Sequence, residues 1–133
     1  MSGRRIVTTA AAPPPIGPYS QAVVAEPLVF CAGQIGLDPV TGTLVAGGVR
    51  AEAERVCANL AAVLAAEDLT LADVVKTTVW LVDLADGPVV GEVYARHFPA
   101  PHPARATVQV AALPAGARVE IEAIAVRRAP AAR

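Results

Sequence analysis

Aromatic residues and long apolar runs are both scarce in this chain. Phe, Trp and Tyr make up 4% of its 133 residues, although hydrophobic residues make up 54%. Its core must therefore consist mainly of Ala, Val, Leu and Ile. Pro, Gly or a charged residue interrupts every apolar run before it reaches the ~18 residues that a membrane-spanning helix needs, so no membrane partner is expected. The length predicts one domain over residues 1–133, with an ordered core at about 4–128 and a tail at 129–133.

Charge of either sign is not in excess. The chain has 11 Lys and Arg against 12 Asp and Glu, which gives a net charge of −1. This balance does not attract nucleic acids or anionic membranes, and we expect no nucleic-acid partner. Arg4 and Arg5 are followed by no long apolar segment, so no secretory signal is expected and the predicted location is the cytoplasm.

Cysteine and metal-ligand patterns are also sparse. Cys31 and Cys57 fall in an expected strand and an expected helix, among apolar neighbours. We interpret them as buried free thiols in a reducing compartment, with a disulfide or a reactive thiol as the alternative. There is no paired cysteine motif, and His97 and His102 lie in or beside a proline-rich loop. The sequence therefore predicts surface histidines and no metal site.

The spacing of apolar residues predicts two helices and six strands in the order βββαβαββ. Residues 50–67 place apolar side chains at three- and four-residue intervals, as in an amphipathic helix, with Glu52 and Asn59 off the apolar stripe. A shorter helix is expected at 89–98, and strands at 4–8, 22–25, 28–35, 74–82, 106–110 and 119–126. This order indicates an α+β sandwich with both helices on one sheet face. The other face is too apolar for water, which predicts a homo-oligomer.

Three charged residues interrupt the last two expected strands. Glu120 and Glu122 lie on one face of the strand at 119–126, and Arg105 begins the strand before it. An arginine can hold a carboxylate with two parallel hydrogen bonds, and a nearby carboxylate can act as a general base. The pattern suggests a site for a small acidic molecule. The residues alone leave open a structural ion pair, or glutamates that edge a solvated face.

Several segments together resemble the RidA (YjgF) family of small reactive-intermediate deaminases. They occur in the family's order and at its approximate spacing, from about Arg4 to Arg128. The C-terminal arginine and Glu-Ile-Glu segments are the most specific. The matching segments are Ile16-Gly17-Pro18-Tyr19-Ser20-Gln21, Ala32-Gly33-Gln34-Ile35, Pro39-Val40-Thr41-Gly42, Val75-Lys76-Thr77-Thr78-Val79, Pro103-Ala104-Arg105 and the run from Val119 to Val126.

The resemblance implies a chorismate-mutase-like homotrimer with clefts between its subunits. It implies hydrolysis of 2-aminoacrylate and related 2-imino acids to 2-keto acids and ammonia, with no cofactor of its own. Arg105 matches the family arginine that binds the substrate carboxylate, and Glu120 matches the glutamate that activates water. Tyr19 matches a tyrosine that lines the cleft, where its hydroxyl would orient substrate or water; capping of the core after a proline turn is the alternative.

Three further positions are expected to bind substrate. Gly33 would let backbone groups approach the ligand closely. Thr107 shares a strand face with Arg105, although simple strand packing is an equal interpretation. Ala32 is a cleft position where several family members have serine, and Gly91 stands where an asparagine is common. These departures leave Arg105 and Glu120 in place but bring the range of substrates into question.

The spacing also predicts how the site is assembled. If 106–110 and 119–126 form a simple hairpin about Ala115, Arg105 lies opposite Ile124 or Ala125, which is about 15 Å from Glu120. One small substrate cannot span that distance, so each site is predicted to combine groups from two subunits. Two other functions remain open at this point. One is a trimeric module that binds small carboxylates without turnover, or acts like a chaperone, and the other is a ribonuclease or translation inhibitor, which the near-zero charge disfavours.

Overall fold

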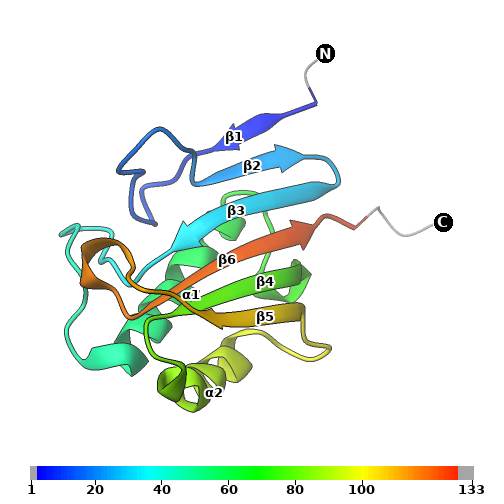
Figure 1. The fold of residues 1–133 in the computed structure, drawn as a ribbon. Coiled ribbons are helices and arrows are strands. Elements are labelled where there is room, and N and C mark those ends of the chain that lie inside the picture. The colour runs from blue at the N-terminus through cyan, green and yellow to red at the C-terminus, as the bar shows by residue number, and fades with distance from the viewer. Residues whose placement is uncertain (1–2, 129–133) are drawn as a thin grey trace.

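A mixed six-stranded sheet with two helices on one face forms the fold (Figure 1). The computed structural model describes residues 3–128. The strand order is β1-β2-β3-β6-β4-β5, in which β4 and β5 run parallel and the other neighbours run antiparallel. The predicted α+β class is confirmed, whereas the expected tail at 129–133 lies outside the described residues. The strands are β1 (Arg5–Val7), β2 (Ala22–Ala25), β3 (Leu28–Gln34), β4 (Val74–Leu81), β5 (Ala104–Gln109) and β6 (Val119–Val126).

The two helices lie close to their predicted positions. Helix α1 (Gly48–Ala65) packs against β3 and β6, and all apolar positions of its predicted stripe are buried. Gly47 and Gly48, with φ of 114° and 82°, start it in the left-handed region that favours glycine. Helix α2 (Gly87–His97) begins two residues earlier than predicted, because Pro88 fits the first helical turn, where a missing N–H has no consequence. Within residues 3–128, no helix is long and apolar enough to cross a membrane.

The predicted hairpin between the last two strands is wrong. Strand β4 lies between β5 and β6, and β5 runs parallel to β4 because α2 connects them. The segment after β5 then passes the end of β4, where Val110 donates to the carbonyl of Leu81 and Val82 donates to that of Arg118. Strand β6 consequently enters the centre of the sheet, between β3 and β4.

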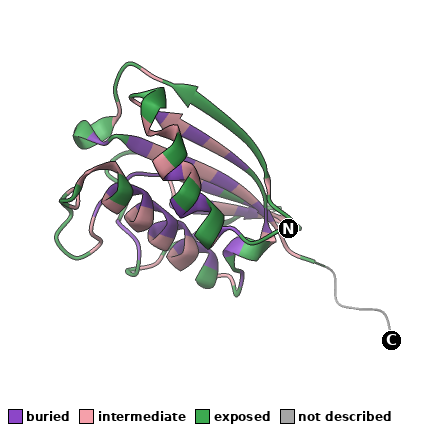
Figure 2. Cartoon of the chain, turned by 90° about the horizontal axis from the view of Figure 1, so that it is seen from below, coloured by how far each residue is buried: buried purple, intermediate pink, exposed green. Residues whose placement is uncertain are grey.

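Burial alternates along the strands and leaves one sheet face open (Figure 2). On β6 the residues facing the helices are fully buried, whereas Glu120 and Glu122 point to the open face. Phe30 and Val108 share that face and are 42% and 43% exposed. The bare, partly apolar face expected from the sequence is therefore present in the single chain. Strand β5 is exposed along its whole length at the edge of the sheet.

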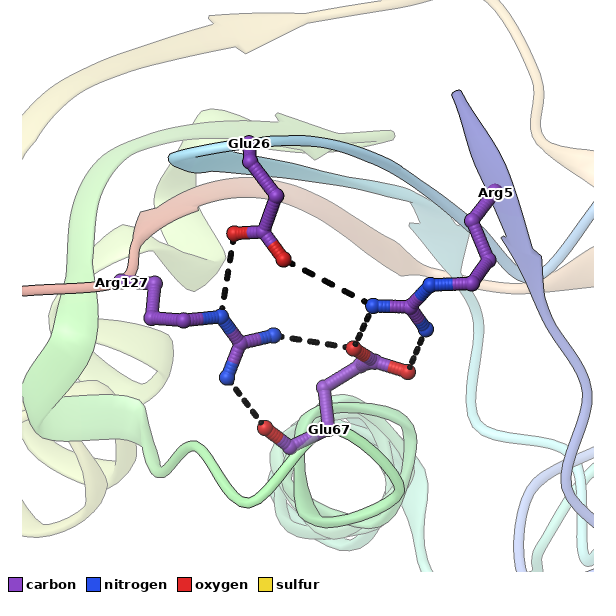
Figure 3. Close-up of polar contacts among 4 residues, drawn as sticks. All are labelled: Arg5, Glu26, Glu67 and Arg127. Carbon is purple, nitrogen blue, oxygen red and sulfur yellow. Dashed lines mark hydrogen bonds and ion pairs between the residues drawn. The ribbon is translucent and has the colours of Figure 1, made fainter. Parts of the chain in front are cut away.

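A network of four charged residues joins β1 and the residue after β6 to the end of α1 (Figure 3). The guanidinium of Arg5 donates to both oxygens of Glu67, at 2.6 and 2.8 Å, and Arg127 donates to the same carboxylate at 2.9 Å. Glu26, in the turn between β2 and β3, pairs with both arginines. The hydrogen bonds from Arg5 lower the pKa of Glu67, whose side chain is 11% exposed. This network stabilises one end of the sheet.

Candidate active site

Glu120 projects from β6 into a hollow of about 410 Å³ on the open face of the sheet. The walls come from the proline-rich segment before β2, from the end of β3 and the residues after it, and from Pro114. They are mostly apolar, so the carboxylate is partly withdrawn from water. The lining residues are Pro13, Pro14, Ile16, Tyr19, Gln21, Ala32, Gly33, Gln34, Ile35, Leu37, Pro114 and Glu120.

The carboxylate of Glu120 lies directly against the backbone of Gly33. A Cβ atom at position 33 would overlap with that carboxylate and would displace it from its present position. The pairing of β3 with β6 is irregular between Cys31 and Gln34, which is where this close approach occurs. Burial raises the pKa of Glu120, and the negative charge of Glu122 raises it further. Glu122 itself accepts a hydrogen bond from Thr78 at 3.0 Å. With its raised pKa, the Glu120 carboxylate is a stronger base than an ordinary glutamate, which suits it to accept a proton from water.

We expect the Glu122→Gln variant to have a lower pKa at Glu120 than the wild type. Removal of the neighbouring negative charge makes ionisation of Glu120 easier, whereas the burial contribution stays. An NMR titration of the side-chain carboxyl carbons measures the pKa in both proteins. Glu92→Gln is a matched control, because Glu92 is an exposed carboxylate on α2. An unchanged Glu120 titration in Glu122→Gln would show that the two carboxylates do not interact.

The proline-rich wall of this hollow is held by Gln21. This side chain is only 2% exposed, and its amide makes four hydrogen bonds to the backbone of the preceding segment. Tyr19, by contrast, is 50% exposed, and its hydroxyl accepts a hydrogen bond from the backbone N–H of Ile16 at 3.2 Å. Tyr19 is thus available to a ligand. The partners of Gln21 are Thr9, Ala12 and Pro13.

Two polar residues of α1 hold the other side of the hollow. The Glu52 side chain is completely buried, and its carboxylate accepts from the backbone N–H and the guanidinium of Arg118, at 2.7 and 2.8 Å. Asn59 is also buried and donates to the carbonyls of Ile35 and Leu37. Both side chains were expected off the apolar stripe, but they lie on the buried face of α1. Their seven-residue separation puts them on one helix face, and this spacing was the sequence signal for their shared burial.

Arg105 lies on the other side of the sheet from Glu120. It pairs in register with Thr77 of β4, whose side chain faces the helices, and its guanidinium is 4.8 Å from the centre of the Tyr94 ring on α2. A hollow of about 430 Å³ surrounds it, and a smaller one of about 170 Å³ shares Arg105 and Gly91 with the first. The larger hollow is lined by Gly91, Tyr94, Ala95, His102, Pro103 and Arg105, and the smaller by Val79, Leu81, Gly87, Val90, Gly91, Arg105 and Thr107.

The predicted site residues therefore form two separate groups in one chain. Glu120 occupies the first hollow together with Tyr19, Ala32 and Gly33, and Arg105 occupies the second group with Thr107. Register places Arg105 beside Thr77 and Glu120 beside Trp80, with β4 between them. Two strand spacings and three residue steps correspond to roughly 14 Å between their Cα atoms. The two side chains do not meet within the chain.

The remaining candidate residues are engaged elsewhere. Cys31 and Cys57 are buried free thiols whose pKa is raised by burial to about 12, which removes them as nucleophiles at neutral pH. His97 forms a hydrogen bond with Glu54 on α1, and His102 forms one with the carbonyl of Phe98. In the described part of the chain, no group of three or more His, Cys, Asp or Glu is placed to hold a metal ion.

Comparison with known proteins identifies the family. The sequence model of the family described as Endoribonuclease L-PSP matches residues 9–127. The chain belongs to this family. A relative in it, the human 2-iminobutanoate/2-iminopropanoate deaminase, is 49% identical over 124 residues, which are 93% of this chain and 90% of the relative.

Two solved L-PSP family structures have the same fold. RidA from the Antarctic bacterium Psychrobacter sp. matches with a TM-score of 0.89 and 46% identity, over 92% of this chain and 98% of that one. TdcF from E. coli, solved with bound serine, matches with a TM-score of 0.88 and 41% identity, over 93% of this chain and 99% of that one. The resemblance to RidA proteins noted in the sequence is confirmed.

Proposed function

We propose that this protein hydrolyses 2-aminoacrylate and related 2-imino acids to 2-keto acids and ammonia. The human relative is named as a deaminase of 2-iminobutanoate and 2-iminopropanoate, and the TdcF structure holds serine, a small amino acid with a carboxylate. The observation that carries the proposal is Glu120, a half-buried carboxylate with a raised pKa that lies in an apolar hollow. Arg105 supplies the carboxylate-binding group that such substrates require.

The active unit is a homotrimer in which each site combines two subunits. Arg105 and Glu120 of one chain lie on opposite faces of the sheet, so one small substrate cannot touch both. A neighbouring subunit that covers the partly apolar open face would place its own Arg105 against the Glu120 hollow. The exposed edge strand β5, which carries Arg105 and Thr107, is the element best placed to reach it. The closed symmetry of such an assembly would give three equivalent clefts.

The chemistry follows from these two groups. The planar fork of Arg105 holds the substrate carboxylate, which orients the imine carbon toward the Glu120 hollow. Glu120 takes a proton from water as the water oxygen bonds to that carbon. Glu120 then gives this proton to nitrogen, where the former C=N electron pair accepts it. In the resulting carbinolamine, the hydroxyl proton passes by way of Glu120 to nitrogen while the C–N bond breaks. The products are ammonia and a 2-keto acid, and Glu120 is again a carboxylate. Tyr19 lines the same hollow and would orient the attacking water.

A coupled assay tests the proposal. D-amino-acid oxidase converts D-alanine to 2-iminopropanoate, and pyruvate release is followed against the spontaneous hydrolysis rate. We expect the wild type to accelerate this release. In Arg105→Ala the loss of the bidentate contact should lower kcat/KM roughly 100-fold, mainly through KM. Calorimetry with pyruvate supplies the second readout. A wild type that binds pyruvate without accelerating hydrolysis would be a carboxylate-binding module rather than an enzyme.

A further inference from the structure

Gly91 occupies a helical position where a larger residue would fit. It lies in the middle of α2, and a Cβ atom built there would meet nothing within 4 Å. A glycine inside a helix is less stable than alanine, because it loses more backbone freedom on folding. At Gly33 and Gly36 a Cβ would collide with Glu120 and Glu52, so those glycines have a packing reason. Within residues 3–128, no neighbouring atom explains why position 91 is a glycine.

The space that Gly91 leaves open lies beside Arg105. Both residues line the large and the small hollow, so a molecule bound to Arg105 would lie next to Gly91. The base of the small hollow is apolar, since it is formed by Val79, Leu81 and Val90, which are at most 3% exposed. Gly87 forms another part of the wall, and a Cβ atom built at this position would also meet no atom within 4 Å.

The small hollow has the size and polarity of an aliphatic or aromatic side chain. Its volume is about 170 Å³, and an apolar cavity of ~150 Å³ accepts a molecule as large as benzene. A substrate whose carboxylate is bound to Arg105 carries its side chain on the neighbouring carbon. This neighbouring carbon is the imine carbon. Its side chain can extend into the small hollow while the planar imine group stays open to attack from outside the hollow.

We propose that Gly91 determines substrate specificity by opening this hollow to the side chain of the imino acid. The inference rests on the proposed deaminase function. Its consequence is a substrate class that includes imino acids with branched or aromatic apolar side chains, such as those derived from leucine and phenylalanine. A side chain at position 91 would fill the entrance beside Arg105 and exclude these substrates, whereas 2-iminopropanoate, with a single methyl group, would still fit.

Variants at position 91 test this by the ratio of two substrates. D-amino-acid oxidase generates the imines of D-phenylalanine and D-alanine, and release of each keto acid is measured above the spontaneous rate. In Gly91→Leu, kcat/KM for the phenylalanine imine relative to the alanine imine should fall at least about tenfold. Gly91→Ala should lower the ratio less and raise the melting temperature, because alanine favours the helix. Glu92→Leu adds the same side chain at the next, exposed position, which lines neither hollow, and should leave the ratio unchanged.

The outcomes separate this inference from the proposed function. If the wild type accelerates neither imine, the deaminase proposal fails and the inference fails with it. If the wild type is active and both imines slow equally in Gly91→Leu and Gly91→Ala, only the inference is wrong. Light scattering gives the mass of each variant. A loss of assembly in Gly91→Leu, with an unchanged substrate ratio in Gly91→Ala, would show that Gly91 makes room for a neighbouring subunit instead.

Discussion

Co-expression of two impaired variants, Arg105→Ala and Glu120→Gln, is expected to restore much of the lost activity. Each site of the proposed trimer takes Arg105 from one subunit and Glu120 from its neighbour. In a random mixture with equal amounts of both variants, about a quarter of the sites receive an intact Arg105 and an intact Glu120. The measurement is kcat/KM for 2-iminopropanoate hydrolysis by the purified mixed oligomer, relative to the wild type and to each variant alone.

The restored activity should stand clearly above the activities of the two variants. Glu120→Gln keeps the size of the side chain but cannot accept a proton from water, so kcat should fall about 10²- to 10⁴-fold. The same substitution removes a carboxylate that burial and Glu122 make difficult to ionise. The Glu120→Gln protein should therefore remain folded, with stability at neutral pH equal to or above that of the wild type. Its stability gain should vanish at low pH, where Glu120 is protonated in the folded state.

A second mixture provides the matched control. When wild-type subunits assemble with subunits carrying both Arg105→Ala and Glu120→Gln, about a quarter of the sites should be active if two subunits share each site. If each site belonged to one chain, about half would be active in this mixture and almost none in the mixture of single variants. That second pattern would overturn the shared-site proposal.

Local pattern was sufficient to predict most elements of this fold. The apolar stripe of α1 and the alternation along β6 each reflect burial against one partner layer, which leaves a periodic signature in the sequence. The bare sheet face was predictable for the same reason, since apolar residues alternate with helix-facing residues on the strands. The bounds of α2 were less well predicted, because the helix was expected to begin after Pro88, although this proline fits the first turn.

Long-range strand order was the part that local pattern did not contain. The sequence between β5 and β6 has the turn residues of a hairpin, and only the parallel pairing of β5 with β4 moves β6 to the other side. That pairing depends on how α2 crosses the sheet. The expected separation of Arg105 and Glu120 was therefore correct for an incorrect reason. A hairpin would separate them along the strands only, whereas in the structure they also lie on opposite sheet faces.

The buried polar residues that shape the candidate site were missed for a different reason. Glu52 and Asn59 carry a charge and an amide, which on a helix normally mark the solvent face. Their burial is compensated by backbone partners that are distant in sequence, at Arg118 for Glu52 and at Ile35 and Leu37 for Asn59. The seven-residue spacing places Glu52 and Asn59 on one helix face, but helical periodicity could not indicate their partners, because those partners belong to loops.

Replacement of Glu52 by alanine is expected to destabilise the protein by about 3 kcal/mol. The substitution leaves the backbone N–H of Arg118 without its acceptor and removes a fully buried side chain from the contact between α1 and the turn before β6. For a chain of this size the change corresponds to a fall of roughly 10 °C in melting temperature. Because oligomer stability depends on concentration, the melting curves must be recorded at equal subunit concentrations.

Glu52→Gln separates the hydrogen bond from the charge. The amide oxygen of glutamine can still accept from the backbone N–H of Arg118, whereas the charged contact with the guanidinium is lost. The expected loss is about 1 kcal/mol, since the Arg118 side chain is 55% exposed and solvent replaces part of that contact. Equal destabilisation by Gln and Ala would assign the stability to the ion pair rather than to the backbone bond. The turn ends two residues before Glu120, so a displaced turn in Glu52→Ala should also lower kcat. If this variant melts at a lower temperature but keeps full activity at 20 °C, β6 holds Glu120 in place without the contact to Glu52.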